Sequence, residues 1–173
     1  MKLLLTNTSV ILRSITQQDE ALLCEIYSST RAEEMERVGD WSKEQKTAFV
    51  RQQFEAQHVY YQQNYIGAAF WIILKNGQAA GRLYIDENFV DGSIRIIDIT
   101  LLPLYRNTGI GEGILKDVLG YAQQKKKPVT IHVESFNPAM KLYERLGFTL
   151  KDKKNGVYYL LEWKAKVGDT QVV

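Results

Sequence analysis

The sequence predicts one mixed α/β domain in which a mostly antiparallel sheet is flanked by helices. Apolar residues recur at helical spacing near the start of the chain, and the period then changes to that of extended strands. Asn76-Gly77 and Asn155-Gly156 are strong hairpin signals between such strands. In the middle of the chain a strand, a helix and a strand follow one another, which implies a right-handed crossover with parallel pairing.

Length and composition support a single domain. The 173 residues suffice for one core of ordinary size. We expect a domain over residues 1–164 and a flexible tail over residues 165–173, which are polar and aperiodic. A net charge of +2 is too small to argue for nucleic acid or an acidic membrane as a partner. Cys24 is the only cysteine, and the longest apolar run, Ile66–Leu74, is too short to span a bilayer. We therefore expect a cytoplasmic protein.

Capping patterns and turn signals predict the elements of the first half. Thr16 with Asp19 resembles a capping box, and Ser42 with Gln45 is a cleaner one, so each pair begins a helix. Asp91-Gly92 marks a turn between two of the strands that follow. The predicted elements are a strand around Val10–Leu12, helices over about Gln17–Ser28 and Ser42–Gln63, and strands over Ile66–Leu74, Gln78–Asp86 and Ser93–Leu102.

The second half alternates between helices and strands. Pro103 ends the third long strand because proline cannot donate to a ladder. A glycine loop then opens a helix whose apolar residues form one stripe, and Gly147 is the expected C-cap of a later, shorter helix. The predicted elements are a helix over Ile110–Lys125, a strand over Val129–Glu134, a helix over Pro138–Leu146 and a hairpin over Phe148–Trp163.

The loop Arg106–Gly111 carries the first functional signal. Gly109 and Gly111, just after a strand and at the start of a helix, let successive backbone N–H groups converge on an anion. The alternative is a tight turn without a ligand, and spacing alone does not separate the two. The loop is not a P-loop, because Glu112 stands where lysine is required, and not a Rossmann fingerprint, which needs glycine in place of Ile114.

Two segments together resemble the GNAT N-acetyltransferase superfamily. The family signature is Arg or Gln, two residues, Gly, one residue, and Gly or Ala, and it appears here as Arg106, Gly109 and Gly111. A second segment, Asn137–Phe148, is similar to the family's Asn-x-Ala-x-x-Leu-Tyr-x-x-x-Gly-Phe. The resemblance covers most of the chain. It implies a sheet that is splayed between the strand before the glycine loop and the parallel strand that follows.

The resemblance implies acetyl-CoA as the acyl donor and a primary amine, on a small molecule or a peptide, as the acceptor that attacks directly. Loop amides would hold the pyrophosphate, and the N–H of Leu101 would polarise the acetyl carbonyl. Asn137 would contact the cofactor, or serve only as a helix cap. The alternative function is a non-catalytic acyl-CoA-binding sensor or regulatory module. The implied cofactor-binding residues are Leu101, Leu102, Arg106, Asn107, Thr108, Gly109, Ile110, Gly111, Asn137 and Tyr143.

Three residues are candidates for catalysis, and no metal site is expected. Tyr143 matches the family tyrosine that protonates the departing CoA sulfur; the alternative is core packing against Phe148. Arg95 stands where the histone-acetylating branch carries its glutamate base, which speaks against that mechanism. Asp98 lies on the same strand with opposite parity, so it faces the site only if a β-bulge intervenes. His132 aligns with a glutamate of N-terminal acetylating relatives, and either relays a proton or simply packs.

The acceptor is less well defined. The connection between the first two predicted helices is acidic, with Glu33, Glu34, Glu36 and Asp40. These residues would suit a cationic amine, although a solvated charge run is the favoured interpretation. Both a monomer and a homodimer are compatible with the sequence.

Overall fold

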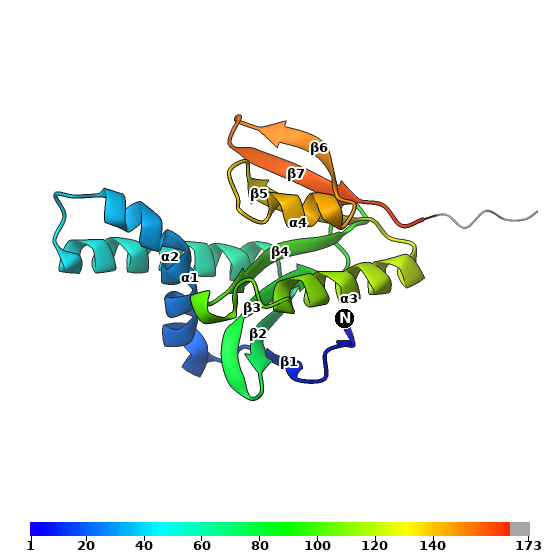
Figure 1. Ribbon diagram of the computed structural model, residues 1–173, viewed down its shortest axis with the longest axis horizontal. Coiled ribbons are helices and arrows are strands. Elements are labelled where there is room, and N and C mark those ends of the chain that lie inside the picture. Colours follow the sequence, from blue (N-terminus) through cyan, green and yellow to red (C-terminus); the bar gives the residue numbers. More distant parts are fainter. Residues whose placement is uncertain (167–173) are drawn as a thin grey trace, which may run out of the picture.

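Within residues 1–166, which the computed structural model describes, seven strands form one sheet in the order β1-β2-β3-β4-β5-β7-β6 (Figure 1). The order of helices and strands along the chain is as predicted, with two added 3-10 turns. The elements are β1 (Val10–Ser14), η1 (Gln17–Asp19), α1 (Glu20–Arg37), α2 (Lys43–Asn64), β2 (Ala69–Lys75), β3 (Gln78–Asp86), β4 (Ile94–Leu101), η2 (Pro103–Tyr105), α3 (Ile110–Lys125), β5 (Val129–Glu134), α4 (Met140–Arg145), β6 (Thr149–Lys154) and β7 (Tyr158–Trp163).

The mixed α/β fold and the predicted splay of the sheet are confirmed. All neighbouring strands pair antiparallel except β4 and β5, which are parallel. The parallel pairing is short: it runs from Ile94 opposite Val129 to Ile96 opposite Ile131. Beyond these pairs the two strands diverge, and β5, β6 and β7 lie above β4 in Figure 1. The carboxyl-terminal halves of β4 and β5 therefore border a gap within the sheet.

Helices cover both faces of the sheet. The larger apolar cluster joins one face to α3 and α4 and contains fully buried side chains such as Leu83, Ile94 and Val118. The smaller cluster joins the other face to α1 and α2 through residues such as Ile26 and Phe54. Each buried aliphatic side chain stabilises the fold by about 1.5–3 kcal/mol. Packing in the two clusters therefore fixes the positions of β4 and β5 on either side of the gap.

The first helix is longer than predicted. It continues to Arg37 because the hydroxyls of Ser28, Ser29 and Thr30 donate to carbonyls three or four residues earlier and are thereby accommodated within the helix. The acidic residues Glu33, Glu34 and Glu36 therefore lie on α1 and not in a connection. None of the helices within residues 1–166 combines the length and the apolarity needed to cross a lipid bilayer.

The start of β2 also differs from the prediction. The strand begins at Ala69, and Ile66 is 89% exposed in the turn that follows α2. This turn is closed by the N–H of Ala68, which donates to the carbonyl of Tyr65 at 3.0 Å. The apolar residue Ile66, which was predicted to begin the strand, therefore belongs to the turn between α2 and β2.

The local signals for caps and hairpins are confirmed. The capping boxes of η1 and α2 both form, and Ser42 accepts a hydrogen bond from the N–H of Gln45. Both residues of Asn76-Gly77 and of Asn155-Gly156 have positive φ, as a type I′ hairpin requires. Gly147, with φ of 92°, follows α4. The predicted tail lies largely outside the described residues, although Lys166 still exchanges backbone hydrogen bonds of 2.8 Å with the side chain of Gln123.

At Gly81, β3 and β4 leave no room for a side chain. A Cβ atom at this position would lie 2.1 Å from the carbonyl oxygen of Thr100 and 2.9 Å from the Cα of Leu101. We expect Gly81→Ala to force the strands apart and to lower the free energy of unfolding by about 1–3 kcal/mol, measured by urea denaturation. Gly39→Ala is the matched control, since its Cβ meets no atom within 4 Å. Equal stability of the two variants would contradict the expectation.

Candidate active site

The end of β4 presents backbone groups to the gap between β4 and β5. The N–H of Leu102 donates to the carbonyl of Ala80 on β3 at 2.9 Å. Because hydrogen-bonding directions alternate along an antiparallel pair, the N–H of Leu101 points away from β3, toward the side from which β5 has diverged. Leu101 thus offers a backbone donor at the gap, as the family resemblance required.

Arg106 connects this strand end to α1. Its Nε donates to the carbonyl of Leu101 at 2.9 Å, and its Nη2 donates to the hydroxyl and the carbonyl of Ser29 at 2.9 and 3.1 Å. The guanidinium is therefore engaged by protein groups. The backbone N–H of Arg106 donates to the carbonyl of Pro103 at 3.2 Å, so Arg106 fixes the loop and the free backbone donors begin at Asn107.

The glycine loop holds an unbroken row of free donors. Asn107 and Gly109 both have left-handed backbone conformations, with φ of 59° and 83°. Among the described residues, no protein group accepts a hydrogen bond from the backbone amides from Asn107 to Glu112, and the first helical donor is Gly113, to the carbonyl of Gly109 at 2.9 Å. These amides stand at the N-terminus of the 16-residue helix α3, where the helix dipole favours negative charge.

The glycines of the loop fit a ligand better than they fit a turn alone. Gly109 is required by its backbone conformation. Neither packing nor backbone conformation requires glycine at position 111, where a Cβ would meet only the Leu101 side chain, at 3.5 Å. The same holds for Gly113, where a Cβ would meet nothing within 4 Å. A glycine within a helix costs about 1 kcal/mol relative to alanine. The absent side chain at Gly111 therefore keeps the space in front of the amides open for a bound group such as a diphosphate.

The one acidic side chain of the loop is neutralised. Glu112 accepts from Lys116 at 2.8 Å and from Arg145 at 2.7 Å. Hydrogen bonds from Lys116 and Arg145 lower the pKa of Glu112. The carboxylate thus joins α3 to α4 and leaves the positive potential of the helix N-terminus largely uncompensated.

A β-bulge places Asp98 on the face covered by α1 and α2. Ile85 pairs with Ile96 and Tyr84 pairs with Asp98, so Ile97 is an extra residue in β4. The bulge that a site-facing Asp98 required is therefore present. Arg82, which is 2% exposed, donates to Oδ2 of Asp98 at 2.7 Å, and the hydroxyl of Thr100 adjoins the other carboxylate oxygen.

Tyr143 lies on α4, on the opposite face of the sheet from Asp98. It is 4% exposed and packs edge-to-face on Phe148 with ring centroids 5.6 Å apart. Burial, and then the charge of Asp98, raise the pKa of Tyr143. The phenol is therefore protonated at neutral pH. Tyr143 both packs in the core and lies close enough to Asp98 to be affected by its charge.

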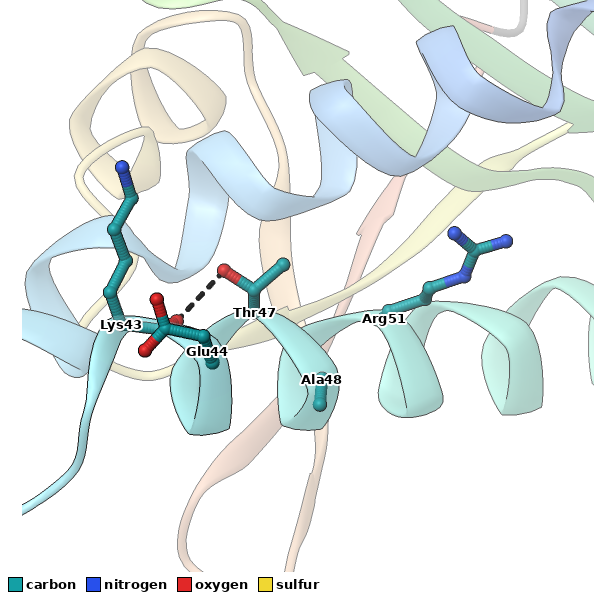
Figure 2. Close-up of a pocket in the computed structure, with 5 residues that line it drawn as sticks. All are labelled: Lys43, Glu44, Thr47, Ala48 and Arg51. Atoms are coloured by element: carbon teal, nitrogen blue, oxygen red, sulfur yellow. Dashed lines mark hydrogen bonds between the residues drawn. The ribbon is translucent and has the colours of Figure 1, made fainter.

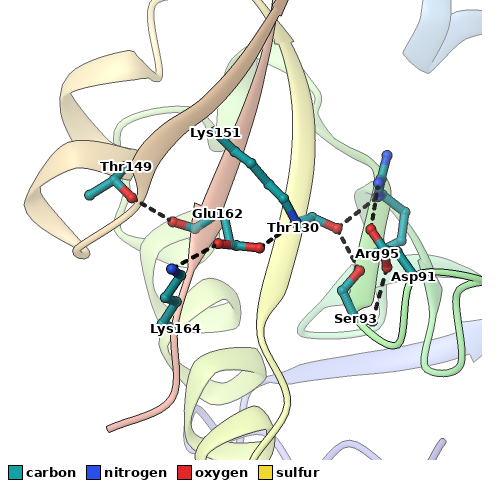
Figure 3. Close-up of polar contacts among 8 residues, drawn as sticks. All are labelled: Asp91, Ser93, Arg95, Thr130, Thr149, Lys151, Glu162 and Lys164. Atoms are coloured by element: carbon teal, nitrogen blue, oxygen red, sulfur yellow. Dashed lines mark hydrogen bonds and ion pairs between the residues drawn. The ribbon is translucent and has the colours of Figure 1, made fainter.

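His132 and Arg95 form a contact across the two parallel strands. Nη1 of Arg95 lies 2.8 Å from Nδ1 of His132, and Nε donates to the hydroxyl of Thr130 at 2.8 Å. Figure 3 shows the guanidinium of Arg95 facing Thr130 and Asp91. Burial and the charge of Arg95 lower the pKa of His132. Arg95, a buried cation, thus occupies the position at which the histone-acetylating branch carries its glutamate base.

Asn137 is not the N-cap of α4 that local chemistry predicted; the N-cap is Ala139, and Asn137 forms the turn just before it. Its side-chain oxygen accepts from the N–H of Ala139 at 2.8 Å, and its carbonyl accepts from the N–H of Met140 at 3.0 Å. The turn that contains Pro138 and Ala139 accounts for the start of α4 at Met140, two residues later than predicted.

A model of the Acetyltransferase (GNAT) family matches residues 35–148. The chain belongs to this family. The match includes the glycine loop, the bulged strand and the segment that begins at Asn137. No curated protein matches the chain in sequence.

Solved structures of GNAT proteins share the fold. PaiA N-acetyltransferase from Thermoplasma acidophilum in complex with coenzyme A is 17% identical, with a TM-score of 0.66 over 91% of this chain and 99% of that one. RimL, a ribosomal L7/L12 alpha-N-protein acetyltransferase in complex with coenzyme A, is 17% identical, with a TM-score of 0.62 over 95% and 98%. Arabidopsis thaliana Naa50 with the bisubstrate analogue CoA-Ac-MVNAL is 18% identical, with a TM-score of 0.59 over 91% and 99%. Likeness at these identities establishes the GNAT fold.

Two surface hollows of this GNAT domain lie apart from the gap between β4 and β5. One, of about 390 Å³, follows α2 and is lined by residues that include Lys43, Thr47 and Arg51 (Figure 2). Another, of about 460 Å³, lies between η1, α1 and α2. Neither contains a residue of the glycine loop or of β4. We therefore place the candidate site by the backbone donors and not by surface concavity.

Sequence reasoning missed one group of buried polar residues next to Asp98. Arg82 and Tyr84 are buried on β3, and Arg82 also donates to Gln57 on α2 at 2.9 Å. Within the described residues, Nε of Arg82 and the hydroxyl of Tyr84 are buried without hydrogen-bond partners. An arginine in the middle of an otherwise apolar strand was the available signal, because a buried charge needs an opposite charge nearby.

Proposed function

We propose that the protein transfers the acetyl group of acetyl-CoA to a primary amine of a small molecule or peptide. The observation that carries the proposal is the row of unpartnered amides from Asn107 to Glu112, next to the gap between β4 and β5. Diphosphate is the part of coenzyme A that such a helix N-terminus binds. Coenzyme A in two structures of the same fold supports this assignment. A cytoplasmic location is part of the same proposal.

Several residues would hold the donor substrate. The amides of the loop would bind the pyrophosphate, and the pantetheine arm would lie along the edge of β4 that ends at Leu101. Leu102 would contribute only its side chain, because its N–H donates to Ala80 and its carbonyl accepts from the N–H of Tyr105. Asn137, at the entrance to α4, would contact the same arm from the other side of the gap. Acetyl-CoA supplies an acetyl thioester, and the N–H of Leu101 would stabilise the negative charge that develops on its carbonyl oxygen.

The reaction we propose needs one proton acceptor and one donor. The amine nitrogen forms a bond to the carbonyl carbon, the carbon–sulfur bond breaks, and the amine proton passes to a base. A lysine-like amine with a pKa of about 10.4 costs roughly 4–5 kcal/mol to present uncharged at pH 7. Asp98 is the favoured base and Tyr143 the donor to the departing sulfur, because Asp98 lies on β4 beyond its last pair with β5 and Tyr143 packs on the opposite face of the sheet. Both candidate bases contact an arginine, but the Asp98 carboxylate keeps further lone pairs beside its bonds to Arg82 and Thr100. The single lone pair of neutral His132 is instead directed at Arg95.

Arg95 favours a second candidate function. A buried cation in place of the family acid suits a module that binds acyl-CoA without turnover. The buried and protonated Tyr143 favours the enzyme, because a binding module has no use for an acid at the position of the thiol.

Binding and turnover separate these proposals. Calorimetry with coenzyme A tests the loop, and release of free thiol from acetyl-CoA tests turnover with α-amino peptides, lysine side chains and polyamines. Binding with turnover of at least one amine supports the enzyme. Binding without turnover of any amine supports the module, and no binding at saturating acetyl-CoA overturns both.

Removal of the Tyr143 hydroxyl should slow catalysis without unfolding the protein. No hydrogen bond from another described residue acts on this hydroxyl, so Tyr143→Phe should remove little stability. We expect kcat to fall about a hundredfold, the low end for loss of a general acid, because a thiol is already a fair leaving group. Tyr60→Phe, at an exposed site on α2, is the control. Equal kcat values for the two variants would exclude Tyr143 as the acid.

A further inference from the structure

His132 stands where the gap in the sheet begins. It follows Ile131, the last residue of β5 that pairs with β4. The side chains of Ile131 and Val133 enter the cluster beneath α3, so His132 points to the opposite face, the face that also bears Asp98. That face is bordered by α1, since Arg31 lies 3.9 Å from Glu134 on β5. His132 as a whole is exposed on that face, so an acceptor can reach the part of the ring that Arg95 does not cover.

Arg95 determines which nitrogen of His132 carries a proton. The guanidinium has donors only, so at the 2.8 Å contact Nδ1 of His132 must accept. The neutral ring therefore carries its proton on Nε2. Arg95 is itself held firmly: it is 4% exposed, donates to Thr130, and lies 4.2 Å above the ring of Phe89.

The surroundings of His132 keep the ring neutral. Burial, Arg95 and Lys154 lower its pKa, and Asp152 acts in the opposite direction. Glu134, two residues along the same face, is 3.9 Å from Arg31. In a neutral ring only one nitrogen has a lone pair to accept a proton, and here that lone pair is occupied by Arg95. His132 is thus a poor base and a well-oriented donor.

We propose that Arg95 is a positioning residue that holds His132 as a hydrogen-bond donor, through Nε2–H, to an oxygen of the acceptor substrate. The proposal rests on the proposed function for the place of the acceptor. An α-amino acid amide or peptide N-terminus carries a carbonyl oxygen next to its amine, whereas a polyamine carries none. The geometry therefore favours α-amines of peptides over polyamines as acceptors.

Nuclear magnetic resonance tests the tautomer without any substrate. The chain has only two histidines, and His132→Gln identifies the ring signals of His132 in long-range 1H–15N spectra. At pH 7 we expect a protonated Nε2 and an unprotonated Nδ1. We expect Arg95→Met to produce a mixture of tautomers; if that variant does not fold, the wild-type spectrum decides. A proton on Nδ1, or on both nitrogens, at pH 7 would overturn the proposal.

Kinetics test the role of the donor. His132→Leu should raise KM for a peptide α-amine about two- to tenfold, the worth of one neutral hydrogen bond, with little change in kcat. His132→Gln, which keeps an N–H donor, should stay within about twofold, and polyamine turnover should respond to neither change. A fall in kcat of about 10²-fold or more in both variants would instead identify His132 as the base. If the wild type acetylates no amine, the proposed function fails while the spectra still report the tautomer.

Discussion

Valine in place of Gly111 is expected to abolish binding of coenzyme A while leaving the protein folded. A Cβ at this position meets only the Leu101 side chain, at 3.5 Å, so protein atoms tolerate it. The same side chain would project into the space in front of the amides that we assign to the pyrophosphate. We expect calorimetry to detect no binding at coenzyme A concentrations that saturate the wild type, and thermal unfolding without ligand to change little.

Gly113→Ala is the matched control for this experiment. Its position lies on the same helix, and a Cβ there meets nothing within 4 Å. Alanine should raise the free energy of unfolding by up to about 1 kcal/mol, because it favours the helix, and should leave binding unchanged. Gly109→Val is less informative, since its positive φ would strain any side chain. Normal binding by Gly111→Val would remove the loop from the cofactor site.

Loss of Arg82 is expected to produce the largest change in stability. Arg82→Met leaves the carboxylate of Asp98 in a largely buried position without its partner at 2.7 Å. Removal of one member of a buried ion pair typically costs about 3–5 kcal/mol. Chemical denaturation of the variant should show a loss of this size in the free energy of unfolding.

A double variant separates stability from chemistry. Arg82→Met combined with Asp98→Asn contains no buried charge at this position and should regain part of the lost stability. Its activity should remain low, because the proposed base is absent. A loss below about 1 kcal/mol in Arg82→Met would mean that Asp98 is well solvated without its partner.

Most of the fold follows from local rules that the sequence displays directly. Capping boxes at Thr16 and Ser42 and hairpins at Asn76-Gly77 and Asn155-Gly156 form because each depends on residues that are neighbours in sequence. The end of α1 and the start of β2 were predicted wrongly because the residues at these places are compatible with two local structures. Ser29 could favour a cap or a helix interior, and apolar Ile66 could favour a strand or a turn.

The backbone part of the candidate site could be predicted from the sequence, and the side-chain part could not. The row of amides follows from glycine spacing before a helix. Contacts between side chains of β3, β4 and β5 did not follow, because they depend on strand register. A single extra residue at Ile97 decides which face Asp98 occupies, and the pairing of Arg95 with Thr130 decides that Arg95 reaches His132. No feature of the sequence alone specifies either register.

Arg106 has a consequence for how the two substrates are sensed. Its guanidinium spans from the carbonyl of Leu101 to Ser29 on α1. In the proposed site Leu101 contacts the thioester and α1 borders the amine, so the Arg106 side chain connects the two parts of the site. We expect binding of an amine that displaces α1 to shift the glycine loop as well. Binding of the amine should then change the affinity for acetyl-CoA, and binding of acetyl-CoA should change the affinity for the amine by the same factor.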